Sequence, residues 1–268
     1  MGLIDAVDLQ QLHRELLEVV GVGQPAAVQG LLEVRHGDDL AALIADAAND
    51  EPGIKPDDVV VVTQKVVSKA EGRIVSLDSV TPSPEAERIA VETEKDPRLV
   101  ELILGESNRI VRQRGPILIT ETKHGFVCAN AGIDASNVGP EGLVSLLPED
   151  PDASAALIRS GIRERTGADV AVIVTDTFGR AWREGHTNVA IGVAGMLPFA
   201  DYVGQTDPHG YELRVSTLAV ADEIAAAAEL VQGKLDRVPV AIVRGYAYPR
   251  GEGTARQLVR DPENDLFR

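Results

Sequence analysis

The sequence predicts a mixed α/β fold, in which strands and helices follow one another without a regular repeat. Three runs rich in Val and Ile are typical of buried strands, and they begin at Val59, Val170 and Val238. The clearest helical pattern lies between Asp150 and Gly167. Because the two kinds of pattern alternate irregularly, a mixed fold fits better than a regular doubly wound sheet.

The N-terminal part of the chain predicts a helix followed by a strand. Apolar residues recur at helical spacing from Leu9 to Val19, which favours an amphipathic helix. The stretch Gly21–Ala26 has glycines spaced as in a dinucleotide-binding loop, but it contains Pro25 and does not follow a strand. We therefore expect a linker or a helix stop there, and then a short strand over Val28–Val34.

The remaining elements follow from turn residues and apolar spacing. Asp39 is expected to cap a helix that continues through Ala48, and Asp150 or Asp152 to cap the helix that ends at Gly167. The other expected elements are a buried strand from Val59, helices over Glu85–Glu94 and Pro97–Leu104, paired short strands in "PILITET" and "GFVCA", a strand over Val170–Val174, a strand that passes into a helix over Ser216–Lys234, a strand in "VPVAIVRG", and a polar tail from Tyr246.

Composition restricts the classes of function. A formal net charge of −16 argues against binding to nucleic acid or to anionic membranes, because both require a basic surface. The single cysteine, Cys128, forms no internal disulfide, and its apolar neighbours favour a packed thiol over a nucleophile. No apolar run approaches the roughly 20 residues that span a bilayer. We expect a soluble cytoplasmic protein.

Two aspartates are candidates for metal binding. Asp176 in "IVTDTFGR" and Asp134 in "NAGIDASNVG" are expected just past strand ends, where carboxylates can bind hard cations such as Mg²⁺. Thr177 adds a hydroxyl beside Asp176. The alternative is that Asp134 forms an Asx turn and Asp176 caps a helix, and the sequence leaves both readings open.

Basic residues near these aspartates suggest a phosphate site. Lys65 and Lys69 lie four residues apart, and Arg180 and Arg183 follow Asp176. Together with a metal ion, these four basic side chains could bind the oxygens of a triphosphate. The alternative is that they form a solvated charged edge, and for Lys65 alone this alternative is preferred. His186 is interpreted as a polar loop residue, with substrate contact as the less favoured reading. The familiar phosphate loop is missing, since "VQGKLD" lacks its upstream glycine and its Ser or Thr.

Several long motifs then occur in a characteristic order. They are "GLLEVRHGDDLAALI", "VVVVTQKVVSKAEGR", "LITETKHGFVCANAGIDASNVG", "LLPEDPDASAALIR", "VAVIVTDTFGRAWREGHTNVAIGVAG", "VADEIAAAAELVQGK" and "VPVAIVRG". The chain resembles the coenzyme F420-0:L-glutamate ligase family, including the ligase domain of actinobacterial two-domain relatives. On this basis we divide it into an N-terminal helical extension (1–27), a ligase domain (28–246) and a junction-like tail (247–268).

The resemblance implies a specific reaction. The family joins L-glutamate to coenzyme F420-0, then adds γ-linked glutamates, with GTP as co-substrate and Mg²⁺ or Mn²⁺ as metal, two ions per site. K⁺ is a further candidate ion. The expected mechanism passes through an acyl phosphate. The resemblance also implies a homodimer, a fold unlike the Rossmann, P-loop and ATP-grasp folds, and, for a longer native chain, a flavin-binding nitroreductase-like domain.

The resemblance also assigns roles to residues. Asp134 and Asp176 match the ligands of one metal and Thr177 a ligand of the second, and Asp134, Asp176 and Lys69 are the expected catalytic residues. From their position in the sequence after Asp176, and not from the resemblance, Arg180 and Arg183 are expected to contact the anionic substrates, with His186 as a less favoured candidate. The residues expected to bind the nucleotide are Leu31, Leu32, Glu33, Val34, Gln64, Lys69, Asn137, Gln232, Gly233 and Lys234, within a loop that extends to Pro239.

This chain departs from the family pattern at a few positions. Leu32 and His36 stand where Pro is common, and His186 and Asn188 stand where Gln and Asp are common. Two other functions use the same aspartates and stay open at this stage: a two-metal phosphatase or GTP hydrolase, and a module that binds metal and GTP without catalysis. GTP cleavage that requires both F420-0 and glutamate distinguishes the ligase from these alternatives.

Overall fold

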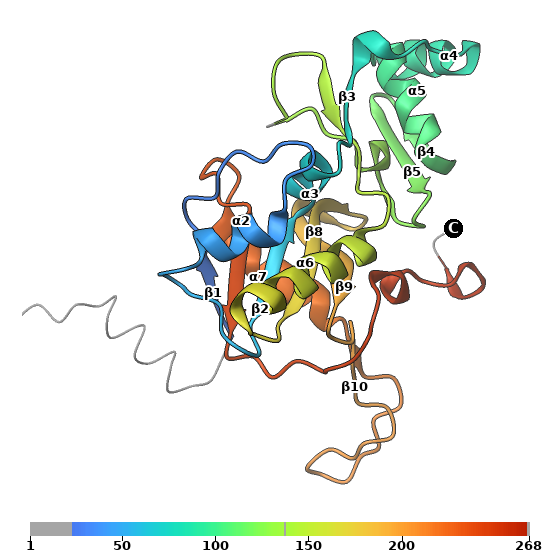
Figure 1. The fold of residues 1–268 in the computed structure, drawn as a ribbon. Helices are drawn as coiled ribbons and strands as arrows, with labels where there is room; N and C mark the ends of the chain where they lie inside the picture. The colour runs from blue at the N-terminus through green and yellow to red at the C-terminus, as the bar shows by residue number, and fades with distance from the viewer. Residues whose placement is uncertain (1–22, 137, 267–268) are drawn as a thin grey trace, which may run out of the picture.

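A mixed five-stranded sheet forms the centre of the larger of two lobes in the computed structural model, which describes residues 23–136 and 138–266 (Figure 1). Its order is β1-β12-β2-β8-β9, and the strands are β1 (Gln24–Ala27), β2 (Val59–Thr63), β8 (Ala171–Arg180), β9 (Arg183–Ala194) and β12 (Val240–Arg244). β2 and β8 run parallel, and the other neighbours are antiparallel. The predicted mixed α/β class is confirmed, and the sheet differs from the parallel sheets of doubly wound folds.

Helices cover both faces of this sheet. Figure 1 shows α2 (Leu40–Ala47) and α6 (Pro151–Thr166) in front of it and α7 (Val220–Gln232) behind it. α3 (Gln64–Ala70) continues directly from β2. The predicted caps of α2 and α6 are confirmed, because Asp39 and Asp150 each accept a backbone N–H of the first turn at 3.0 Å. Within residues 23–136 and 138–266, no helix is long and apolar enough to cross a bilayer.

The smaller lobe has a hydrophobic core of its own. It contains α4 (Pro84–Thr93), α5 (Pro97–Gly105) and an antiparallel sheet of β4 (Ser107–Arg114), β5 (Ile117–Thr122) and β6 (Val127–Ala129). Ile89, Ile103 and Leu118 are fully buried in it. β3 (Ile74–Ser76) pairs with β7 (Leu143–Ser145). Pairing of β5 with β6 confirms the two predicted strands, whereas β4 was not predicted. Figure 1 shows α3 where the two lobes meet.

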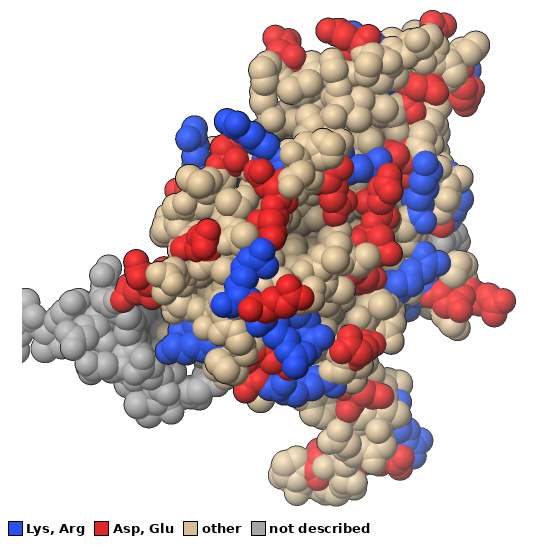
Figure 2. Space-filling view, in the orientation of Figure 1, with Lys and Arg blue, Asp and Glu red and all other residues tan. Residues whose placement is uncertain are grey.

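The remaining segments lie at the periphery. β10 (Ala200–Asp201) pairs with β11 (Thr217–Leu218) at the base of an arm that projects from the larger lobe (Figure 1). Short 3-10 helices are η1 (Leu77–Ser79), η2 (Asn130–Gly132), η3 (Ala255–Leu258) and η4 (Pro262–Asn264). The C-terminal segment packs against the larger lobe, since Ala255 is fully buried and its N–H donates to Asp152 at 2.8 Å. Figure 2 shows acidic side chains on both lobes of one face, with basic side chains among them.

Two expectations about strands are wrong: the strand over Val28–Val34 and the strand end at Val174. Residues 28–34 form no strand, and the preceding Gln24–Ala27 pairs with β12 instead. Pro25 is compatible with this pairing because β1 is an edge strand. The predicted helix around Leu9–Val19 lies outside the described residues. The strand expected to end at Val174 continues to Arg180, because β9 pairs with it along this whole length.

Candidate active site

The candidate site residues gather where the parallel pairing of β2 and β8 ends. Thr63 of β2 lies opposite Thr175 of β8, so the next residues, Gln64 and Asp176, follow at the same edge of the sheet. Beyond this point the chain of β2 enters α3, which carries Lys65, while β8 continues into a hairpin with β9. Asp176 therefore lies within a strand, and the alternative reading of Asp176 as a helix cap is wrong.

Asp134 is held by a short turn and by a lysine of α3. Its Oδ1 accepts the backbone N–H of Ser136 at 2.7 Å, which confirms the predicted Asx turn, and its Oδ2 accepts the Ser136 hydroxyl at 2.9 Å. Lys65 Nζ lies 2.7 Å from Asp134 Oδ2. The preferred reading of Lys65 as part of a solvated edge is wrong, because its ammonium group is the counter-ion of Asp134. Asp134 follows η2 rather than a strand end.

The two aspartates have opposite electrostatic environments. Burial disfavours ionisation of Asp134, but hydrogen bonds from Lys65 and Ser136 and the charge of Lys65 outweigh it and lower the pKa of Asp134. Burial raises the pKa of Asp176 to about 7; the Thr177 N–H acts against this rise, and the charge of Asp134 adds to it. Near neutral pH a second negative charge therefore develops beside Asp134, which favours binding of a cation.

Thr177 connects β9 and the end of α7. It lies opposite Asn188 in the β8–β9 ladder, and its hydroxyl donates to Asn188 Oδ1 at 2.7 Å. Lys234, two residues beyond the end of α7, donates from Nζ to the Thr177 hydroxyl oxygen at 2.6 Å. Asn188 is buried. Sequence reasoning missed this arrangement because Thr177 and Lys234 are 57 residues apart.

The first part of the expected nucleotide site is brought together with α3. Lys69 Nζ forms an ion pair with Glu33 Oε1 at 2.6 Å, so the segment 31–34 lies beside α3. Val34 is buried, Leu31 is partly buried, and Leu32 is 72% exposed. Asn137, another expected contact, lies outside the described residues. The sequence thus predicted a real proximity, although the ion pair itself was not expected.

Two buried glutamines complete this region. Gln64 accepts the Ser68 hydroxyl at 2.8 Å through Oε1, while its Nε2 has no hydrogen-bond partner among the described residues. Gln232 donates from Nε2 to the Val61 carbonyl at 3.2 Å, and its Oε1 has no such partner either. Gly233, with φ of 59°, ends α7 directly after Gln232. Buried polar atoms without a partner are rare, and a bound ligand is one way in which they are satisfied.

The expected substrate-binding residues lie farther out on the hairpin. Arg180 pairs with Arg183 near its tip, and the Arg180 guanidinium donates to the carbonyls of Gly185 and Glu184 on the same hairpin. Arg183 and His186 are exposed. At about 3.3 Å per residue, Arg180 lies roughly 10 Å along the strand from Thr177. The structure thus brings the metal and nucleotide candidates together and leaves this group on the outer hairpin.

Comparison with known proteins identifies the family. The sequence profile of the F420-0:gamma-glutamyl ligase family matches residues 30–245. The chain belongs to this family. It is 49% identical over 245 residues to the coenzyme F420:L-glutamate ligase of Methanothermobacter thermautotrophicus, covering 90% of this chain and 97% of that protein. Proteins of the same name from Methanopyrus kandleri and Haloarcula marismortui are 49% and 46% identical, over 88% and 90% of this chain and 94% of each protein.

Membership of a ligase family confirms the resemblance seen in the motifs. The candidate metal ligands in this fold are Asp134 and Asp176. Residues 23–136 and 138–266 contain no group of three or more His, Cys, Asp or Glu arranged as metal ligands. Asp134 and Asp176 provide two carboxylates, and the pKa of Asp176 is about 7. This fits a hard cation such as Mg²⁺, which keeps water and phosphate oxygens as its other ligands.

The thiol beside this ligase-family site is packed in the interior. Cys128 is buried, and burial raises its pKa to about 12, with a contribution from the charge of Asp176. At neutral pH the thiol is therefore protonated and unreactive. The prediction of a packed thiol is confirmed.

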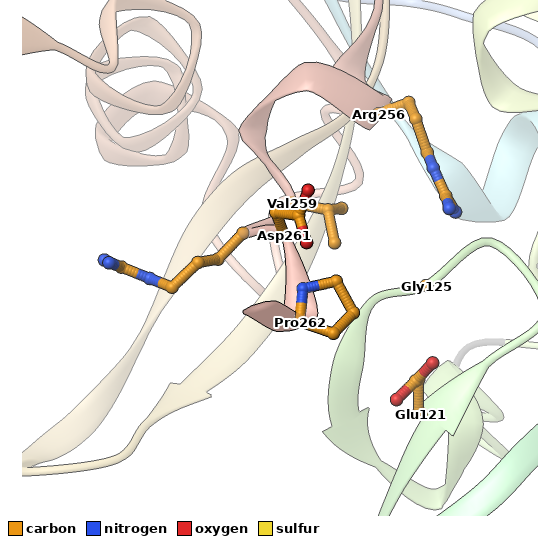
Figure 3. A pocket seen from close by; sticks show the side chains of 7 residues that line it. Glu121, Gly125, Arg256, Val259, Asp261 and Pro262 are labelled. Carbon is orange, nitrogen blue, oxygen red and sulfur yellow. The ribbon is translucent and has the colours of Figure 1, made fainter. Parts of the chain in front are cut away.

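A separate cavity of about 230 Å³ lies between the C-terminal segment and the β5–β6 turn (Figure 3). Figure 3 shows Arg256 reaching toward the loop that contains Gly125, and its guanidinium donates to the His124 carbonyl. The lining residues are Glu121, Gly125, Arg256, Val259, Arg260, Asp261 and Pro262. None of the candidate site residues lines this cavity, so it is distinct from the Asp134–Asp176 site.

Proposed function

We propose that this chain joins L-glutamate to coenzyme F420-0 in a GTP-dependent reaction and then adds further glutamates through γ-linkages. The family profile and relatives that bear the name coenzyme F420:L-glutamate ligase support the choice of acceptor and amino acid. The observation that carries the proposal is the meeting of Asp134, Asp176 and Lys65 at one edge of the sheet of a ligase-family fold.

The chemistry requires activation of the acceptor, because a free carboxylate is a poor electrophile. A carboxylate oxygen of F420-0 attacks the γ-phosphorus of GTP, the bond to the bridging oxygen breaks, and GDP leaves. The amine of glutamate then attacks the resulting acyl phosphate at carbon. Phosphate departs with the electron pair of the broken bond, and the amine loses a proton. Since anionic groups converge in each step, positioning and charge stabilisation supply most of the catalysis.

We assign the divalent ion, Mg²⁺ or Mn²⁺, to Asp134 and Asp176. When bound, the ion supplies neutralisation of phosphate charge. Lys65 and Ser136 hold the Asp134 carboxylate in one orientation through contacts of 2.7 to 2.9 Å. The low pKa of Asp134 keeps this ligand ionised, and Asp176 joins it as an ionised ligand near neutral pH. The K⁺ ion suggested by the resemblance is not assigned to any residue.

We assign the nucleotide to the region where segment 31–34, α3 and the end of α7 lie near one another. Lys69 neutralises phosphate charge, after exchanging its exposed partner Glu33 for the nucleotide. The unpartnered amide atoms of Gln64 and Gln232 offer one donor and one acceptor to the ligand. Asn137, Gly233 and Lys234 complete the expected set.

The proposal extends to substrates and assembly. Arg180, Arg183 and His186 contact the carboxylates of F420-0 or glutamate from the outer hairpin, where Arg183 and His186 are exposed. A homodimer, a cytoplasmic location and, in a longer native chain, a flavin-binding nitroreductase-like domain belong to the same proposal. They are supported only by likeness to the family.

Mass spectrometry of the products tests the reaction directly. Purified protein is incubated with F420-0, L-glutamate, GTP and Mn²⁺, and the expected products are heavier than F420-0 by whole glutamyl units. They should be absent without GTP and absent with Asp176→Asn. Consumption of GTP without a heavier acceptor, at a rate independent of F420-0 and glutamate, would contradict the ligase and identify a hydrolase. Binding of GTP without turnover would identify a non-catalytic module.

A further inference from the structure

The hydrogen bonds of Thr177 show which way its hydroxyl is oriented. The Lys234 ammonium can only donate, so the oxygen of Thr177 accepts from it at 2.6 Å. The single hydroxyl proton is then donated to Asn188 Oδ1 at 2.7 Å. Asn188 is 2% exposed and paired with Thr177 across the ladder, which holds this orientation. One lone pair of the Thr177 hydroxyl therefore accepts from a positive charge that belongs to the protein itself.

The surroundings of Thr177 differ from those of Asp176. Both residues lie within β8, and successive side chains of a strand point to opposite faces of the sheet. Asp176 interacts through its charge with Asp134, Lys65 and Cys128, and Lys234 is the last and weakest of its charged neighbours. Thr177 faces Lys234 at the end of α7. The hydroxyl thus lacks the pair of carboxylates that makes the Asp134–Asp176 site suitable for a hard cation.

The Thr177 hydroxyl forms hydrogen bonds with one ammonium group and one neutral amide. A divalent ion on its hydroxyl oxygen would have to displace Lys234 or share a position beside it against like-charge repulsion. The only carboxylate within an ion-pair distance of Lys234 is Glu229, at 3.7 Å from Nζ, among the residues that the structure describes. The residues at Thr177 therefore do not fit a second divalent metal.

We propose that the Lys234 ammonium takes the place of a second divalent cation beside Thr177, so that the protein loaded with nucleotide holds one divalent ion per protomer. This inference rests on the proposed GTP- and metal-dependent function. The Lys234 side chain is 63% exposed, so its ammonium, which has three donors, can reach a phosphate oxygen of the nucleotide while it stays beside Thr177. Asn188 is a positioning residue, because it acts on the nucleotide only through the Thr177 hydroxyl.

Counting bound Mn²⁺ tests this proposal without measuring turnover. The full chain is titrated with Mn²⁺ in the presence of a non-hydrolysable GTP analogue, and free Mn²⁺ is followed by electron paramagnetic resonance. We expect one ion per protomer for the wild type and for Lys234→Arg, and two for Lys234→Gln. Lys123→Gln, a matched loss of charge on the smaller lobe, should also bind one ion.

The outcomes separate this inference from the proposed function. Two ions on the wild type, or one ion on Lys234→Gln, would overturn the role of Lys234 and leave the ligase reaction intact. Binding of no Mn²⁺ by the wild type would overturn both. Thermal unfolding of each variant shows whether it is folded, and Asn188→Leu should weaken binding of the GTP analogue while the count of Mn²⁺ stays at one.

Discussion

Replacing Asp176 by asparagine should abolish the ligase reaction and, at the same time, stabilise the metal-free protein at pH 8. Burial raises the pKa of Asp176 to about 7 from an ordinary value of 3.8. The folded protein therefore binds this proton more tightly than the unfolded chain does. The resulting stabilisation is complete below about pH 4 and is lost as the pH rises through about 7. Above that pH the ionised carboxylate destabilises the fold.

The size of the stabilisation expected for Asp176→Asn follows from the shift in the pKa of Asp176. A change of about three pKa units, at about 1.36 kcal/mol per unit, sets a ceiling near 4 kcal/mol. Relaxation of the fold and entry of water around the ionised carboxylate reduce this cost, and we expect about 2 kcal/mol. For a protein of this size that corresponds to a rise in Tm of about 4 to 8 °C. At pH 5, where Asp176 of the folded protein is protonated, the gain should fall to less than about half.

Thermal unfolding in the presence of a chelator measures this gain, and the neighbouring aspartate is the matched control. The pKa of Asp134 is lowered, so its ionised form stabilises the fold above the unfolded pKa. Asp134→Asn should therefore lower Tm at pH 8, opposite in sign to Asp176→Asn. A lower Tm for Asp176→Asn at pH 8, or a shift of both variants in the same direction, would refute the electrostatic account.

Other parts of the molecule yield three further predictions. Cys128, with a pKa of about 12, should resist iodoacetamide at pH 8 in the native protein and react with it in urea. Mass spectrometry detects the alkylated product, and its rapid formation in the native protein would contradict the burial of Cys128. Gly192→Ala places a Cβ 2.2 Å from the Pro151 carbonyl oxygen, so urea unfolding should show a loss of about 1 to 3 kcal/mol, and no loss would refute this packing. Lys69→Met should weaken calorimetric binding of a GTP analogue about tenfold, with Tm nearly unchanged because its partner Glu33 is exposed; unchanged affinity would exclude Lys69 from the site.

Local signals were sufficient for much of the fold. Asp39 and Asp150 precede their helices directly, and each caps the first turn as expected because the contact spans three residues. The runs "PILITET" and "GFVCA" predicted the paired strands β5 and β6, and the apolar neighbours of Cys128 predicted its burial. Family membership was also readable from the linear motifs, since these require no knowledge of the fold.

Long-range partners depended on the tertiary structure. Lys65 looked like a surface lysine until the fold placed it 2.7 Å from Asp134, and Lys234 reaches Thr177 across 57 residues of sequence. The strand expected over Val28–Val34 lies earlier in the sequence, because the residues that pair with the edge of β12 are Gln24–Ala27. Charge interactions and strand pairing depend on distance in space, which separation along the chain does not reveal. The residue types of the site were therefore predictable from the sequence, whereas their partners and protonation states were decided by which segments the fold brings to the ends of β2 and β8.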